Sequence, residues 1–168
     1  GIDFRKTGYS FFGIVSGRRL SISAGANRGD GVFFGEHPFL GRSTDGNVGI
    51  FLRPTSRLRA DLRTLFSRFV NPVNGTEIFD LQIYRWRATY QFTDHLLLRH
   101  IMEHNTFTGA LGNNMLLTYR INAGTVAFLG YDDRYQRGFE INEMFFPTNQ
   151  LKRTNRAFFT KISYLFRY

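Results

Sequence analysis

The chain has 168 residues, with 22 Lys and Arg against 13 Asp and Glu, a formal charge of +9, and an aromatic content of 17%. It contains no cysteine, which argues against a disulfide-stapled secreted module and against thiolate metal sites or thiol catalysis. Its longest apolar runs, at 115–117 and 126–129, fall far short of the roughly 20 residues that a membrane-spanning helix needs. We therefore expect a single domain over residues 1–168 that contains no such helix.

Apolar and polar residues alternate with a period of two along much of the chain, which predicts strands with one apolar and one polar face. In chain order, the clearest segments are 19–27, 47–53, 57–66, 84–92, 114–121 and 155–168. Alternation is less regular over 8–16, 96–106 and 126–135, and a change of apolar face between Ile83 and Tyr84 suggests a bulge. The pattern predicts about nine antiparallel strands.

The connections between these strands are alternately short and longer. Short connections are expected at 16–18, 54–56, 93–94 and 122–124, and longer ones at 28–46, 71–76, 108–112 and 136–154. Bacterial outer-membrane barrels have short periplasmic turns and longer outer loops. We therefore expect an all-β fold, an antiparallel transmembrane β-barrel in the outer membrane of a Gram-negative-type bacterium. Because such barrels have an even number of strands, nine strands suggest the C-terminal portion of a larger barrel.

The final segment has an apolar or aromatic residue at nearly every second position back from the C-terminus, like the closing strand of an outer-membrane barrel. Such a strand also resembles the signal that barrel-assembly machinery reads. The candidate signal residues are Phe158, Ile162, Tyr164, Phe166 and Tyr168. The expected partners are outer-membrane lipid, this machinery, and either other subunits or a missing N-terminal portion of the same barrel.

Several runs resemble the C-terminal part of an uncharacterised bacterial outer-membrane family. They are LRPTSRL at 52–58, ATYQFT at 88–93, TYRINAGT at 118–125, GYDDRY at 130–135 and FTKISYLFRY at 159–168. In that family a carbohydrate-binding, family-nine-like β-sandwich precedes a C-terminal barrel. The resemblance implies architecture, and a link to carbohydrate binding or uptake, but it supplies no catalytic residues. This sequence departs from the full pattern because it contains neither the sandwich nor the earlier strands.

Arginine recurs on the polar faces of consecutive predicted strands. In a barrel these faces would line the lumen, where arginine favours anions. Alternatively, the arginines build an internal lattice of ion pairs with Asp61, Asp80 and Glu103. The candidate lumen-lining residues are Arg53, Arg57, Arg59, Arg63, Arg85, Arg87, Arg99 and Arg120. The expected role is structural or pore-forming.

Two motifs suggest enzyme chemistry and are better explained otherwise. The segment 100–104 matches the H-x-x-E-H zinc-protease pattern, but on a strand His100 and His104 would lie about 13 Å apart, too far for one ion. Asp132, Asp133 and His104 could activate water, although residues of this kind at a barrel rim are more often solvated or part of a network that anchors a loop. A third motif, Arg28-Gly29-Asp30, falls on a predicted loop and fits turn chemistry. We expect no enzyme, and no catalytic, cofactor or metal site.

The alternative from another class is a soluble basic β-barrel that binds single-stranded nucleic acid, because basic strands with aromatic residues can stack on bases. In this sequence Arg85 and Arg87 alternate with Tyr84 and Trp86. The alternation places charge and rings on opposite faces, whereas a base-stacking surface needs both on one face. We therefore expect no nucleic acid among the partners.

Overall fold

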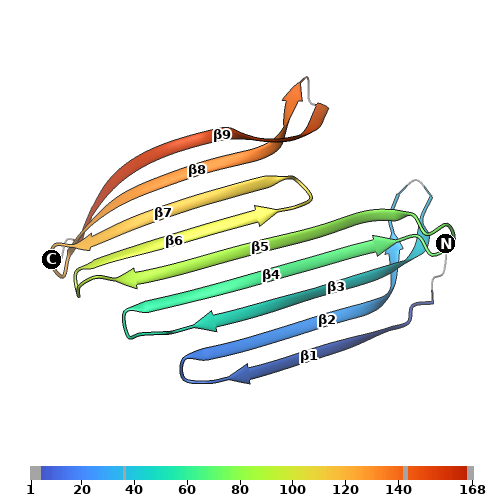
Figure 1. The fold of residues 1–168 in the computed structure, drawn as a ribbon, viewed down its shortest axis with the longest axis horizontal. Coiled ribbons are helices and arrows are strands. Elements are labelled where there is room, and N and C mark those ends of the chain that lie inside the picture. Colours follow the sequence, from blue (N-terminus) through green and yellow to red (C-terminus); the bar gives the residue numbers. More distant parts are fainter. Residues whose placement is uncertain (1–4, 36, 142–143, 166–168) are drawn as a thin grey trace.

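The computed structural model describes residues 5–35, 37–141 and 144–165, and all regular secondary structure in these residues is β. Each strand pairs antiparallel with the next, so the order in the sheet is the order in the chain (Figure 1). The described strands are β1 (Gly8–Ser16), β2 (Leu20–Phe33), β3 (Phe39–Leu52), β4 (Leu58–Val70), β5 (Glu77–Gln91), β6 (Leu96–Asn105), β7 (Ala110–Arg120), β8 (Thr125–Ile141) and β9 (Met144–Tyr164). The predicted all-β antiparallel fold is confirmed.

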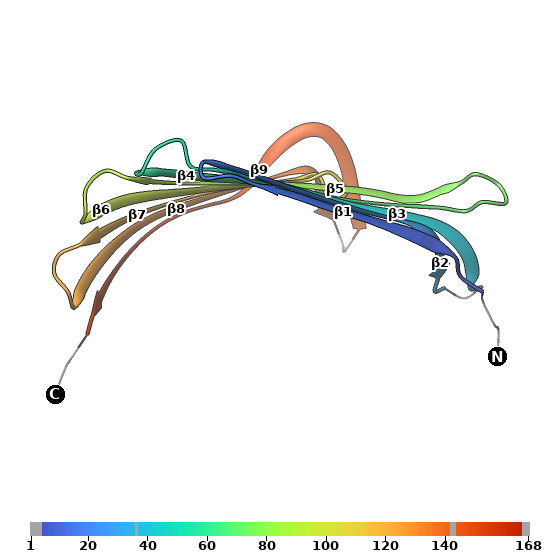
Figure 2. The same ribbon diagram turned by 90° about the horizontal axis from the view of Figure 1, so that it is seen from below.

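The sheet is open, because β1 and β9 form its two edges and do not pair with each other in the described residues (Figure 1). Figure 2 shows a single arched layer, with no second layer of the described residues packed on either face. No helix in the described part of the chain is long and apolar enough to cross a membrane. The structure therefore confirms the antiparallel sheet but does not confirm the closed barrel that the sequence predicts.

The four short turns lie where the sequence predicts them, between β1 and β2, β3 and β4, β5 and β6, and β7 and β8. Side-chain oxygens hold three of them. The amide of Leu58 donates to Thr55 Oγ1 at 3.1 Å, and that of Leu96 donates to Thr93 Oγ1 at 3.0 Å. Asn122 Oδ1 accepts from the amide two residues on, at 2.9 Å. Local turn chemistry thus suffices to end these strands.

Two of the predicted long loops are wrong. Strands β2 and β3 extend through most of 28–46, and β8 and β9 extend through most of 136–154. The Arg28-Gly29-Asp30 tripeptide consequently lies inside β2, where Asp30 accepts hydrogen bonds from the amide of Thr7 at 2.9 Å and its hydroxyl at 2.7 Å. Side chains in these extensions are polar on both faces or mixed, so the alternation that identifies a strand disappears.

The predicted bulge between Ile83 and Tyr84 is also wrong. Pairing of β4 with β5 runs without interruption past both residues, and its register shifts only between Phe69 and Val70. Leu81 and Ile83 therefore stay on the face opposite Tyr84. Their apolar character reflects a local cluster on that face, where the Phe69 ring stacks on that of Phe79 with centroids 5.9 Å apart.

The register sorts the side chains of the sheet into two faces, which we call the apolar face and the polar face. Consecutive partners across β2 to β6 on the apolar face are Ile22, Ile50, Leu62, Trp86 and Met102. One position along, consecutive partners on the polar face are Ser23, Gly49, Arg63, Arg85 and Glu103. The predicted two-sided strands are therefore aligned into two continuous surfaces.

Almost nothing in this sheet is buried. Among the described hydrophobic residues only Ala60 and Phe69 are buried, at 5% and 6% exposure. The accessible surface is 12720 Å², whereas a compact monomer of this mass would expose about 8,500 Å². A single layer leaves its apolar side uncovered, and burial of apolar surface is the main force that stabilises a fold. The apolar face therefore needs a covering that these residues do not supply.

Several aromatic rings lie flat across a glycine on the neighbouring strand. Phe66 covers Gly46 and Phe159 covers Gly130, each directly opposite in the register. Phe69 lies across Gly41, so that a Cβ at this glycine would overlap the ring. This arrangement protects the exposed backbone of the glycine and fixes the register.

A methyl group at Gly41 should therefore destabilise the sheet. We expect Gly41→Ala to lower the free energy of unfolding by about 1–3 kcal/mol, because the Phe69 ring must leave its position. Gly112→Ala is the matched control, since a Cβ there meets nothing within 4 Å. Urea unfolding of both variants measures the difference, and equal effects would contradict the ring-over-glycine contact.

Candidate functional site

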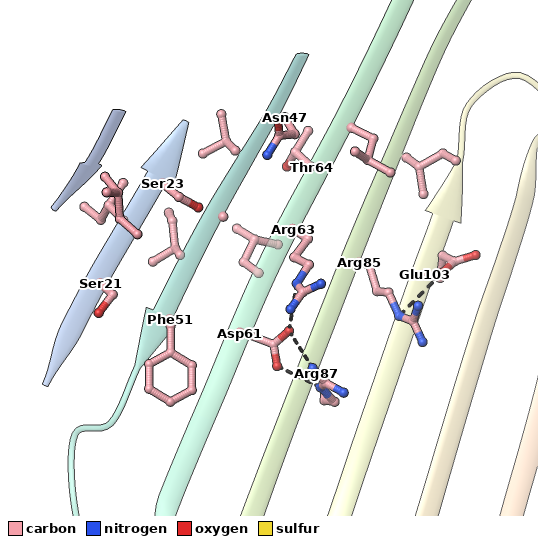
Figure 3. Close-up of a pocket in the computed structure, with 18 residues that line it drawn as sticks. Ser21, Ser23, Asn47, Phe51, Asp61, Arg63, Thr64, Arg85, Arg87 and Glu103 are labelled. Carbon is pink, nitrogen blue, oxygen red and sulfur yellow. Dashed lines mark hydrogen bonds and ion pairs between the residues drawn. The ribbon is translucent and has the colours of Figure 1, made fainter. Parts of the chain in front are cut away.

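Three of the eight predicted lumen-lining arginines form an ion-pair lattice on the polar face (Figure 3). Arg87 donates to both Asp61 oxygens, from Nε at 2.8 Å and from Nη2 at 3.2 Å. Arg63 Nε lies 3.7 Å from Asp61, and Arg85 Nε lies 3.6 Å from Glu103. The arginine side chains are 44–68% exposed, so each pair contributes little to stability.

The other five arginines have no carboxylate partner in the described part of the chain. They are Arg53, Arg57, Arg59, Arg99 and Arg120, and all are exposed. Asp80, the third predicted partner, faces Arg68 on the apolar face, so that part of the lattice prediction is wrong. Arg59 and Arg99 flank Thr89 in the register, which leaves uncompensated positive charge on the polar face near the short turns.

The polar face is hollowed over β1 to β6 into an open trough of about 650 Å³ (Figure 3). Small residues, including Ser21, Ser23 and Gly49, form part of its lining. Phe51 supplies an apolar wall, and the Asp61 lattice lies at one side. The lining combines guanidinium donors and hydroxyl groups with the apolar side chains of Ile14, Leu65 and Ile83, so it offers both polar and apolar contacts to a solute.

The apolar face carries a continuous band without Lys, Arg, Asp or Glu. All described tyrosines and Trp86 lie on this face. Tyr90, Tyr119 and Tyr164 border the band near the short turns, and Tyr9, Tyr84 and Tyr131 border it on the other side. From Tyr84 to Tyr90 the band measures about 20 Å along the strand.

The band is slanted relative to the strands. Following the register from Ser16, the last residue of β1, leads through successive partners to Ala157 on β9. Strand β9, however, continues seven residues further, to Tyr164. A stagger of this size over eight strand pairs corresponds to a strand tilt of about 30°, given standard strand spacing and rise.

A buried carboxylate lies on the apolar face just beyond this band. Asp133 is 3% exposed, and its Oδ2 accepts hydrogen bonds from the Tyr131 and Tyr135 hydroxyls at 2.6 and 2.8 Å. Arg156 Nη2 lies 3.1 Å from Oδ2, and Arg153 Nε lies 3.3 Å from Oδ1. We call these five residues the Asp133 cluster. The period of two gives no signal of it, because Arg153 falls in the predicted loop at 136–154, and only the strand register brings Arg153 and Arg156 beside Asp133.

The strand register places the residues of each predicted enzyme motif on opposite faces of the sheet. Asp132 points to the polar face, where Arg134 Nε lies 3.1 Å away, so it is not paired with Asp133. His100 and His104 are on the apolar face of β6, whereas Glu103 is on the polar face. No group of three potential ligands that could hold a metal ion occurs among the described residues.

The candidate assembly-signal residues that the structure describes all lie on the apolar face of β9. Phe158 and Ile162 are each 72% exposed, and Tyr164 is 59% exposed. Phe166 and Tyr168 lie outside the described residues. Phe159, which breaks the alternation in the sequence, points to the polar face and covers Gly130.

These features define a class: a β-barrel-like, all-β protein whose open sheet has an apolar band on one face and arginine on the other. Comparison with known proteins adds no name to this class, because no protein family, curated protein or solved structure matches the chain. The resemblance to the outer-membrane family stays a prediction.

Proposed function

We propose that this sheet forms part of the wall of an outer-membrane β-barrel, with a structural or pore-forming role. Its apolar face lies against lipid and its polar face lines the lumen. The slanted, charge-free band with tyrosine on both borders is the observation that carries this proposal. Outer-membrane barrels have an outward apolar band about 25 Å tall between aromatic girdles, on strands tilted by about 35–45°.

The open edges support the same interpretation. Unpaired backbone groups of β1 and β9 are costly in a lipid environment, where only closed barrels satisfy every strand. We propose that further strands, from the same protein or from other subunits, pair with these edges. The polar trough and the unpaired arginines then face a wet lumen, where they favour anions.

The proposed cellular location and partners are supported by the same apolar band and by the sequence pattern. The proposed location is the outer membrane of a Gram-negative-type bacterium, and the proposed partners are its lipid and the barrel-assembly machinery, which would read the exposed side chains of β9. A link to carbohydrate binding or uptake rests on the family resemblance alone.

The nucleic-acid alternative is less well supported by the side-chain arrangement. The eight arginines lie on or beside the polar face, where Phe51 is an exposed ring, whereas Trp86 and all described tyrosines lie on the other face. Recovery of the protein without detergent, together with oligonucleotide binding that falls steeply with salt, would favour this alternative.

Site-directed labelling tests the membrane assignment on adjacent residues of β4. The chain has no cysteine, so Leu62→Cys and Arg63→Cys each introduce a unique thiol, on the apolar and polar face respectively. In vesicles, we expect a fluorophore on Leu62→Cys to be quenched by brominated lipid and one on Arg63→Cys by aqueous iodide. The single Trp86 should be quenched by brominated lipid without any substitution. Equal aqueous quenching of both labels would contradict the proposal.

Conductance in planar bilayers separates the two roles. An anion-preferring current that loses its preference in Arg59→Glu indicates a pore. A folded, membrane-inserted protein without conductance indicates a structural role.

A further inference from the structure

The arginines on the apolar face are confined to one side of the band. Six arginines lie on this face in the described strands, and every one is on the side away from the short turns. They are Arg28, Arg42, Arg68, Arg137, Arg153 and Arg156. Three of these six belong to the β8–β9 hairpin, directly beyond Tyr131 and Tyr135. In the proposed barrel this level is the outer membrane surface, where lipid headgroups lie.

The Asp133 cluster holds two of these guanidinium groups in place. Arg156 lies over the Tyr131 ring, 5.9 Å from its centroid, and Arg153 lies over the Tyr135 ring at 5.5 Å. Asp133 bridges the two arginines and also accepts the hydroxyl groups of both tyrosines. The arginines are therefore positioned before any ligand arrives, which lowers the entropy cost of binding.

The same arginines retain free donors. Each guanidinium has five N–H groups, and the contacts of Arg153 and Arg156 with Asp133 use only part of them. Their side chains are 46% and 43% exposed. Two arginines and one aspartate leave a net positive charge, to which the exposed Arg137 adds another from the same face. Guanidinium groups arranged in this way match phosphate oxygens.

We propose that the Asp133 cluster and Arg137 bind the phosphate groups of an anionic lipid headgroup at the outer surface of the membrane. This inference rests on the proposed function. Asp133 is a positioning residue, and the three arginines contact the phosphate. The adjacent charge-free band receives the acyl chains of the same lipid, so headgroup and tail are recognised on one continuous face.

Lipid titration of the detergent-solubilised protein, followed by native mass spectrometry, tests the proposal. The probes are diphosphorylated lipid A, phosphatidylglycerol, phosphatidylcholine and inorganic phosphate. We expect tighter binding of the two anionic lipids than of phosphatidylcholine. Arg153→Gln combined with Arg156→Gln should weaken lipid A binding about tenfold. Arg137→Gln, which leaves the Asp133 cluster intact, should weaken it about threefold and guards against misfolding of the double variant.

Arg134→Gln is the matched control, because Arg134 lies on the same hairpin but on the polar face, beside Asp132. Its binding should be unchanged. Equal binding of anionic and neutral lipids, or equal losses in Arg134→Gln and Arg137→Gln, would overturn the inference. Displacement of lipid A by inorganic phosphate at similar concentration would assign the site to free phosphate and would also overturn it. A protein that enters vesicles but shows no headgroup preference refutes this inference alone, whereas a protein that fails to enter vesicles refutes the proposed function as well.

Discussion

Leu62→Arg should destabilise the membrane-embedded protein by about 2–4 kcal/mol, the usual penalty for arginine on the lipid face of a barrel near the bilayer midplane. Leu62 lies in the middle of the apolar band, between Ile50 and Trp86 on the neighbouring strands. An arginine there must either leave its charge in hydrocarbon or distort the sheet to reach the headgroups. Urea unfolding in phosphatidylcholine vesicles, followed by Trp86 fluorescence, measures the loss.

The same substitution on the other face provides the control. Leu65 lies on β4, points to the polar face and is 52% exposed. Leu65→Arg should change the free energy of unfolding by about 0.5 kcal/mol or less, as expected for an exposed site. If both variants lose the same stability, then the two faces do not differ in environment and the membrane assignment fails.

Asp133→Asn should produce the second large loss. The substitution keeps the shape of the side chain but removes the charge that holds Arg153 and Arg156 together. It also turns one oxygen into an amide donor in a site already supplied with donors by Tyr131 and Tyr135. We expect the unfolding temperature to fall by roughly 5 °C or more. Circular dichroism of the reconstituted protein measures it.

The neighbouring carboxylate separates this effect from a general loss of charge. Asp132 lies on the polar face, its side chain is 20% exposed, and its partner Arg134 is 67% exposed. Asp132→Asn should therefore shift the unfolding temperature much less, since exposed ion pairs contribute little. A similar shift in both variants would mean that the Asp133 cluster is not specially stabilising.

The strands that cross the apolar band were predictable because apolar and polar residues alternate along each of them. Leu62 and Arg63 are adjacent in sequence and lie on opposite faces, so the period of two is visible without any structure. The short turns were predictable for a local reason, since Thr55 and Asn122 bind amides within three residues of themselves. Both kinds of signal involve interactions of short range along the chain.

The extensions of β2, β3, β8 and β9 were not predictable by the same reasoning. At Arg28–Asp30 and around Arg153, apolar residues do not alternate with polar ones, so hydrophobicity shows no period of two. Backbone pairing with the neighbouring strand forms the sheet there. The alternation of apolar and polar residues, which identifies the other strands, is absent here, so these extensions were predicted to be loops.

The candidate site was likewise predictable only in part. The polar-face positions of Arg63, Arg85 and Arg87 follow from strand periodicity, and the register then decides that Asp61 and Glu103 are their partners and that Asp80 is not. The Asp133 cluster joins side chains as far apart in the chain as Tyr131 and Arg156, so it exists only once β8 and β9 pair.

The amino-acid sequence by itself determined the all-β class, the number of strands, the short turns and the two-sided character of each strand, because these depend on neighbours in the chain. Only the tertiary structure decided the stagger that slants the apolar band, the partners of the arginines and the Asp133 cluster. Each of these depends on register, and register is set by contacts between strands, such as Phe66 across Gly46, that the order of residues along one strand does not contain.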